Sequence, residues 1–248
     1  MIPDGVRSIG DRAFSDCEGL TSITIPDSVT SIGESAFSGC FGLTSVTIPD
    51  SVTSIGDWAF ESVRNITVNQ YICNSGYQNL GFGYVTNLVI ADGVTSIVRP
   101  AFSGWMGDLV SVTIPNSVTN IGDYAFNRCY CLTSVTIPNS VVNIGEYAFE
   151  MCEQLTDLMI PDSVANIGYG ALRYCYGLTN VIISGGAVNI GTEAFSEDRA
   201  LVNVTLGDGV LDIGAYAFGG NGFTDLIIPD SVTNIGESAF GNCSGLTM

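Results

Sequence analysis

The chain has 248 residues, of which 46% are hydrophobic, so it can bury a sizeable core. Its charge is unbalanced: there are 25 aspartates and glutamates but only 7 basic residues, all of them arginine, and the formal net charge is −18. Such a charge repels phosphate groups, which argues against nucleic acid as a partner. Apolar runs stay shorter than the roughly 18 residues of a membrane span, so we predict no membrane insertion.

One sequence pattern returns along the whole chain. Its clearest copy is LTSITIPDSVTSIGESAFSGC, from Leu20 to Cys40. The copies form about ten coils of 20–24 residues, which begin at 20, 43, 63, 85, 109, 132, 155, 178, 201 and 223. Linkers do not separate them, so we expect residues 1–248 to form a single repeat domain.

Within a coil, the alternation of apolar residues from Leu20 to Ile25 predicts a β-strand, and Pro26 ends it by removing a backbone donor. Residues 29–32 predict a second, shorter extended piece. Residues 34–37 predict one helical or 3-10 turn that buries Phe37. A chain that changes direction three times in about 23 residues builds a mainly β solenoid of parallel, stacked strands.

The full pattern, L-x-x-I-x-I-P-x-x-V-x-x-I-G-x-x-A-F-x-x-C, resembles the BspA-like, or Treponema-type, leucine-rich repeats and covers nearly the whole chain. The resemblance implies a leucine-rich-repeat solenoid. It also implies a surface-exposed protein, because some proteins with these repeats are adhesins that bind host matrix proteins or other cells. It brings no catalytic residues.

Six cysteines recur at one position of the repeat, and two lie off this ladder. Because equivalent side chains of stacked coils point in parallel, about 4.8 Å apart, we expect buried free thiols rather than disulfides. The alternatives are a zinc site at Cys129 and Cys131 or a disulfide that involves Cys131. The ladder positions are Cys17, Cys40, Cys129, Cys152, Cys175 and Cys243, and Cys73 is the other cysteine off the ladder.

Acidic residues also recur, directly after Ile-Gly and in the turn after the first strand. Asp11, Glu34 and Asp57 are examples of the first column. We interpret them as turn and capping residues that accept backbone hydrogen bonds. Calcium between neighbouring carboxylates is the alternative. We therefore assign no metal ligands and expect no cofactor, with calcium as the one possible ion.

Aromatic side chains supply the candidate ligand-binding residues. Four aromatic residues precede the buried alanine of their coils: Trp58, Tyr124, Tyr147 and Tyr216. Other coils carry polar residues at this position, so we expect the aromatic side chains to be exposed, and we take the first three as candidate ligand-binding residues.

A second candidate region is the irregular coil 63–84, which loses the Ile-Gly and Ala-Phe landmarks. Either it repairs packing, or Arg64, Tyr71 and Tyr77, with Trp105 of the next coil, mark a kink or contact site.

The two ends of the chain match complementary parts of the repeat. Met1, Ile2 and Pro3 match the end of the first strand, and Leu246, Thr247 and Met248 match its beginning. Either the chain is an excerpt of a longer repeat protein, or copies join head to tail through these six residues and form a filament.

These observations favour binding over catalysis. Without histidine or lysine there is neither an imidazole base nor an amine nucleophile, so we predict that the protein is not an enzyme. We expect a binding or adhesion scaffold, located outside the cell or on its surface, that contacts a matrix or cell-surface protein. The alternative is a structural subunit that self-associates end to end.

Overall fold

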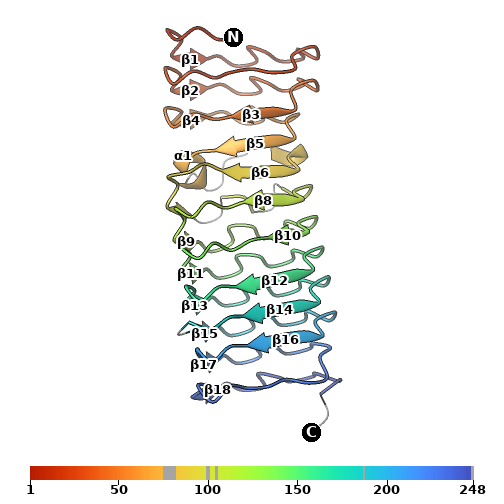
Figure 1. Ribbon diagram of the computed structural model, residues 1–248. Helices are drawn as coiled ribbons and strands as arrows, with labels where there is room; N and C mark the ends of the chain where they lie inside the picture. Colours follow the sequence, from red (N-terminus) through yellow and green to blue (C-terminus); the bar gives the residue numbers. More distant parts are fainter. Residues whose placement is uncertain (75–81, 99–100, 104–105, 187, 247–248) are drawn as a thin grey trace.

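The structure, a computed structural model, describes residues 1–74, 82–98, 101–103, 106–186 and 188–246. The coils stack along one axis, with the N-terminus at one end of the stack and the C-terminus at the other (Figure 1). Neighbouring strands are parallel and pair in register, as in Ser31 with Ser54 and Ile32 with Ile55. The predicted solenoid of parallel stacked strands is therefore confirmed.

The longer strands build one side of the solenoid. Their inward residues are buried and their outward residues are exposed, as Leu158 and Met159 show in neighbouring positions. Within the described residues they form two sheets, β3 (Ser45–Thr47), β5 (Asn65–Val68), β6 (Asn87–Ile90), β8 (Ser111–Thr113) and β10 (Ser134–Val135), followed by β12 (Asp157–Ile160), β14 (Asn180–Ile183) and β16 (Asn203–Leu206).

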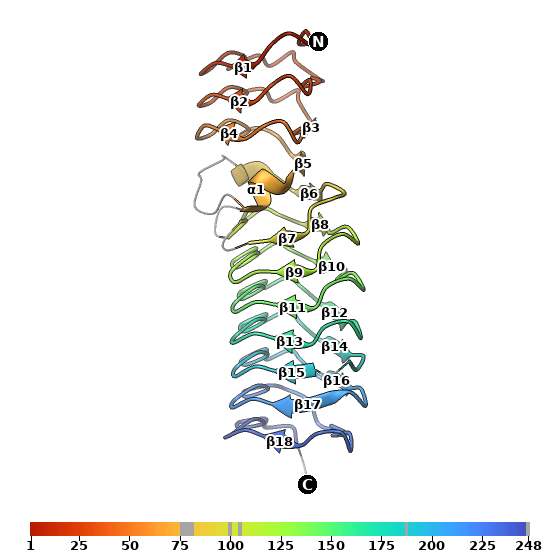
Figure 2. The same cartoon turned by 90° about the vertical axis from the view of Figure 1, so that its left-hand side faces the viewer.

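The shorter strands build a second side, in two sheets separated by the irregular coil (Figure 2). Most of these strands end in an isoleucine that is followed by a glycine, whereas Val98 follows Ile97. Gly33 lies so close to the preceding coil that a Cβ on it would be 2.4 Å from the backbone nitrogen of Asp11. The strands are β1 (Ser8–Ile9), β2 (Ser31–Ile32) and β4 (Ser54–Ile55), then β7 (Ser96–Ile97), β9 (Asn120–Ile121), β11 (Asn143–Ile144), β13 (Asn166–Ile167), β15 (Val188–Ile190), β17 (Val210–Ile213) and β18 (Asn234–Ile235).

The third side differs from the sequence prediction. Residues 34–37 form hydrogen-bonded turns instead of a helical or 3-10 turn. The reason is that Ser35 has φ +53°, in the left-handed region, and this directs its N–H to the carbonyl of Asp57 in the next coil at 2.8 Å. Phe37 donates likewise to Ala59, at 2.9 Å. Hydrogen bonds to the next coil therefore alternate with bonds inside the coil, such as the one from the N–H of Ser38 to the carbonyl of Ser35 at 3.1 Å.

The core is a set of columns in which equivalent residues contact each other. Phe37 is fully buried, as predicted, and its ring stacks on Phe14 at 5.2 Å and on Phe60 at 5.4 Å between centroids. Burial of one such ring stabilises the fold by about 1.5–3 kcal/mol, and aromatic stacking adds about 0.5–1.5 kcal/mol. The contacts that hold a coil are therefore contacts with its neighbours.

In the irregular coil, helix α1 (Gln70–Asn74) replaces the short strand, and a 3-10 helix, η1 (Phe82–Tyr84), follows (Figure 2). Asn69 donates from its Nδ2 to the carbonyl of Pro49 at 2.6 Å. It also caps the helix, because its Oδ1 accepts from the N–H of Ile72 at 3.1 Å. Gln70 bonds to β7 (Ser96–Ile97), which in the described part of the chain has no strand of the irregular coil to pair with: its Nε2 donates to the carbonyl of Ser96 at 2.9 Å. The prediction that this coil departs from the repeat is supported by these elements.

All eight cysteines have free thiols, as the spacing predicts for the six of the ladder. The prediction that the ladder is buried is wrong for Cys17, which is exposed, and only partly right for Cys243, because these two lie in the terminal coils of the stack. Cys129, Cys152 and Cys175 of the ladder are fully buried. Burial raises the pKa of each of these thiols, and it raises the pKa of Cys73 to about 12. They pack as small apolar side chains.

Candidate binding surface

The third side of the solenoid carries a column of residues with positive φ. Tyr124 has φ 57° and Tyr147 has φ 55°, and each donates its N–H to the carbonyl of the next coil, Glu146 at 2.8 Å and Tyr169 at 2.9 Å. The left-handed conformation is costly for a residue with a Cβ, and these hydrogen bonds offset the cost. The side chains of this column consequently project outward at regular intervals.

Five partly or fully exposed tyrosines gather on three consecutive coils of this side. The ring of Tyr147 stacks on Tyr124, with centroids 4.9 Å apart, and meets the ring of Tyr169 edge to face at 5.0 Å. Tyr174 and Tyr176 lie with their centroids 6.0 Å apart. We name these five residues the tyrosine cluster.

Burial raises the pKa of Tyr147 to about 12, and its hydroxyl contact with Tyr169 contributes to the same shift. The phenol is therefore neutral at every physiological pH.

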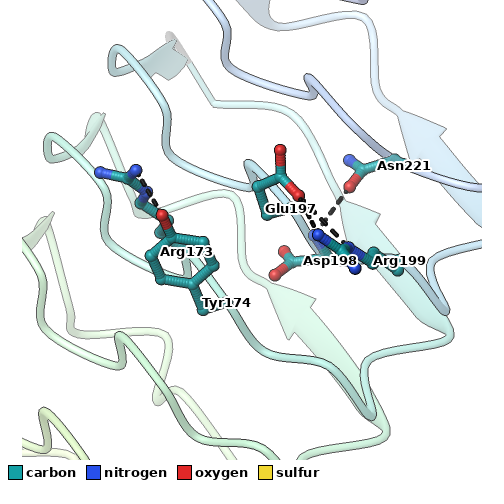
Figure 3. A network of polar contacts seen from close by, with 6 residues as sticks. All are labelled: Arg173, Tyr174, Glu197, Asp198, Arg199 and Asn221. Atoms are coloured by element: carbon teal, nitrogen blue, oxygen red, sulfur yellow. Dashed lines mark hydrogen bonds and ion pairs between the residues drawn. The ribbon is translucent and has the colours of Figure 1, made fainter. Parts of the chain in front are cut away.

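Arg173 supports the cluster (Figure 3). Its Nη1 lies 2.6 Å from Oε2 of Glu193, and its Nη2 donates to the hydroxyl of Tyr174 at 2.6 Å. Its guanidinium carbon also lies 4.4 Å from the centre of the Tyr174 ring. With about a quarter of each charged side chain exposed, the ion pair is half-buried and holds Tyr174 in place.

A row of polar side chains leads from Arg173 along the stack. Asn127 accepts from Ser103 at 3.2 Å and donates to Oε2 of Glu150 at 2.7 Å. Burial raises the pKa of Glu150, whereas the bond from Asn127 and the charge of Arg173 lower it. The row gives the tyrosine cluster a rigid polar border.

The sequence was compared with models of known protein families. The model for the BspA type leucine rich repeat region (6 copies) matches residues 1–104, 70–196 and 170–248, which together span the whole chain. The chain belongs to the BspA-type leucine-rich repeat family. The expected family is thereby confirmed.

Solved leucine-rich repeat proteins share the architecture. A leucine-rich repeat protein from Bacteroides ovatus is 29% identical with a TM-score of 0.69, over 99% of this chain and 70% of that one. A leucine-rich repeat protein from Eubacterium ventriosum is 22% identical with a TM-score of 0.54, over 99% of this chain and 82% of that one, and shows the fold alone. No curated protein matches the sequence.

The structure of this BspA-type chain brings some of the predicted ligand-binding residues together and separates others. Tyr124 and Tyr147 are neighbours in the tyrosine cluster. Trp58, with 40% of its surface exposed, occupies the same column but lies before the irregular coil. Arg64 is exposed just before β5, and Tyr71 belongs to α1 and packs partly against the core. Tyr77 and Trp105 lie outside the described residues.

Sequence reasoning missed Tyr169, Arg173 and Tyr174. Tyr169 stands where six other coils carry an acidic residue, and Arg173 is the one basic residue at a position where other coils carry serine, glycine, asparagine or glutamate. Aligning every column of the repeat, instead of the column of Trp58 alone, would have found both substitutions.

Two of the acidic residues after Ile-Gly accept backbone hydrogen bonds, but from the next coil, whereas the turn interpretation predicted amides of their own turn as the donors. Oδ1 of Asp11 accepts from the N–H of Glu34, and Oδ1 of Asp123 from that of Glu146, both at 2.9 Å. Within the described residues, groups of three or more potential metal ligands were not found. Calcium at these columns stays a hypothesis.

The residues predicted to join copies lie at the two ends of the stack. Met1 is fully exposed, Ile2 is buried and Pro3 is exposed. An apolar cavity of about 350 Å³ opens beside them, against Val6 and Phe14 among others. At the other end Leu246 packs partly against the core, whereas Thr247 and Met248 lie outside the described residues.

A membrane-spanning helix was also sought in the described part of the chain. Neither the length nor the hydropathy of any helix there is sufficient to cross a bilayer.

Proposed function

We propose that this BspA-type solenoid is a non-enzymatic scaffold that holds a protein partner on its tyrosine cluster. The observation that carries the proposal is the contact of Tyr124, Tyr147 and Tyr169 on adjacent coils, next to the paired Arg173. Tyrosine and arginine are enriched among residues that dominate binding energy at protein interfaces. Rings fixed by their neighbours also lose little conformational entropy on binding.

The charge of the chain favours a basic partner. The formal net charge is −18, and the carboxylate of Glu150 lies close enough to Arg173 for the two charges to interact. An acidic surface attracts a basic one and accelerates their encounter, and lysine or arginine side chains also bind to tyrosine rings. A matrix or cell-surface protein with a basic surface fits both features, and we accordingly place the chain outside the cell or on its surface.

Binding of the purified chain to a panel of immobilised extracellular-matrix proteins tests this proposal. We expect Tyr147→Ala to weaken binding about 30-fold, the effect of losing a contact worth ~2 kcal/mol. Tyr216→Ala is the matched control, because Tyr216 has 42% of its surface exposed in the same column but lies outside the cluster. Equal losses in the two variants, or no binding to any panel member, would contradict the proposal.

Head-to-tail assembly is a second candidate function, and the apolar cavity beside Met1 and Phe14 supports it. A solenoid end with exposed core side chains gains free energy when another coil covers it. Sedimentation velocity over a wide concentration range is the test: assembly predicts rods that lengthen with concentration. A monomer that persists at high concentration would rule assembly out.

A further inference from the structure

In two consecutive coils a polar side chain occupies the position of the ladder cysteine. Every ladder thiol after Cys17 donates toward a carbonyl of the preceding coil. Sγ of Cys175 lies 3.2 Å from the carbonyl oxygen of Phe149, and Sγ of Cys243 lies 3.1 Å from that of Phe218. Between these two coils, Asp198 and Asn221 occupy the ladder position. Both are buried polar side chains in an otherwise apolar column.

Asn221 keeps the hydrogen-bond pattern of the ladder. Its Nδ2 donates to the carbonyl of Phe195 at 2.9 Å, as a thiol does in other coils. Its Oδ1 accepts from the N–H of Asp198 at 3.0 Å (Figure 3). The side-chain oxygen of Asn221 therefore accepts a hydrogen bond from the preceding coil, and its side-chain nitrogen donates one to the same coil.

One coil earlier, Asp198 makes the accepting hydrogen bond of this arrangement. It is fully buried, and its Oδ1 accepts from the N–H of Cys175 at 2.7 Å. Its Oδ2 has no hydrogen-bond partner among the described residues. In other coils the ladder side chain donates to the carbonyl of the residue that follows the alanine of the preceding coil, as in Cys175 to Phe149. For Asp198 that residue is Leu172, whose carbonyl accepts no hydrogen bond from the described part of the chain.

The groups around Asp198 offer its carboxylate no counter-charge. Cys175 and Asn221 face it from the two adjacent coils and are uncharged. Glu197 precedes it in its own coil and pairs instead with Arg199, at 3.0 Å. A buried carboxylate without a cation is costly, and so is a carboxylate oxygen without a donor.

We propose that Asp198 is a neutral carboxylic acid at pH 7 and that its Oδ2–H donates to the carbonyl of Leu172, completing the ladder. Burial raises the pKa of Asp198 well above its usual value, with Glu197 raising it further and the N–H of Cys175 lowering it. Ionisation would place a negative charge against the Leu172 carbonyl, in the coil that carries Arg173 and Tyr174. The protonation state of Asp198 thus makes the stability of this junction pH-sensitive.

The proposal fixes the sign of the pH dependence. A carboxyl group whose folded-state pKa is raised binds more protons when folded than when unfolded. Its stabilising contribution is complete below the unfolded pKa of about 3.9. The contribution declines as the pH rises from there to the folded-state pKa.

Denaturant unfolding of the wild-type chain and of Asp198→Asn at pH 5 and pH 7 tests it. Asparagine donates to the carbonyl as Asn221 does and has no proton to lose. We expect the ratio of the unfolding equilibrium constant of the wild type to that of the variant to rise about tenfold per pH unit, or about 100-fold between pH 5 and pH 7. The exposed Asp162→Asn is the control and should show no such change. A ratio that stays constant with pH would overturn the proposal.

A second measurement does not depend on the variant being stable. In the ¹³C NMR spectrum of the native chain at pH 7, we expect one aspartate Cγ resonance at the position of a neutral acid. Asp198→Asn, or Asp198→Cys if the amide does not fold, should remove that resonance. If every aspartate Cγ of the native chain resonates as a carboxylate at pH 7, the proposal is wrong.

Discussion

The ring of Tyr147 lies directly over Gly170 of the next coil. A Cβ built on Gly170 would be 2.8 Å from Cε1 of the Tyr147 ring, closer than real side chains allow. Gly170 has φ +56°, yet Glu193 has φ 57° at the same position one coil later. The backbone therefore accepts a side chain at this position, and it is the ring of Tyr147 that requires glycine.

We predict that Gly170→Ala displaces the Tyr147 ring and lowers the free energy of unfolding by about 1–2 kcal/mol, through the steric clash and the positive φ. Removal of the ring should relieve part of this loss. Denaturant unfolding of Gly170→Ala, Tyr147→Ala and the double variant measures the coupling. Purely additive losses would show that the contact has no energetic role.

The two arginine ion pairs should differ in strength. Removal of Arg173 leaves Glu193 half-buried without its partner, and we expect Arg173→Ala to cost about 1–3 kcal/mol of unfolding free energy. Arg199 is the matched control, because 74% of its side chain is exposed, and Arg199→Ala should cost about 0–1 kcal/mol. Thermal and denaturant unfolding compare the two variants, and equal losses would refute the distinction.

The thiols should react in an order set by their exposure. Cys17 is exposed and Cys131 partly so, whereas Cys152 and Cys175 are fully buried with their pKa values raised by burial. Because the thiolate is the reactive form, an alkylating reagent at pH 8 should modify Cys17 first and the buried thiols only after unfolding. Mass spectrometry of the modified peptides gives the order. Modification of Cys152 at the rate of Cys17 would contradict the buried ladder.

Chelation should leave the thermal stability unchanged. The carboxylates of Asp11 and Asp123 already accept backbone hydrogen bonds from the following coils, which stabilises the turns without a cation. We expect the same Tm in excess EDTA and in excess calcium. A Tm that rises in calcium, and does not rise in Asp123→Asn, would instead assign a calcium site to this column.

The coil, its strands and its core were predictable because the same residue type returns at each structural position. Phe37 and Phe60 are buried for the same reason in every coil, so one copy of the repeat explains the others. The left-handed residue Ser35 was not predictable, because Glu34-Ser35-Ala36 is locally compatible with a helix and only hydrogen bonds to the next coil override that preference.

The binding surface was predictable only in part. Tyr124 and Tyr147 were found because they share a column. Arg173 pairs with Glu193 from a different column of the next coil, and such a contact requires the relative placement of two columns. Helix α1 was hidden for a similar reason, since Asn69 and Gln70 stabilise it through contacts with Pro49 and Ser96 of the neighbouring coils.

The in-register stacking of Phe37 on Phe60 bears on how such a chain can vary in length. Deletion or duplication of one whole regular coil by recombination would place phenylalanine on phenylalanine and isoleucine on isoleucine again. The new junction would then resemble the old one. The coil with α1 cannot be exchanged in this way, because Gln70 bonds to particular neighbours. Gain and loss of coils should therefore be tolerated among the regular coils and resisted around residues 63–98.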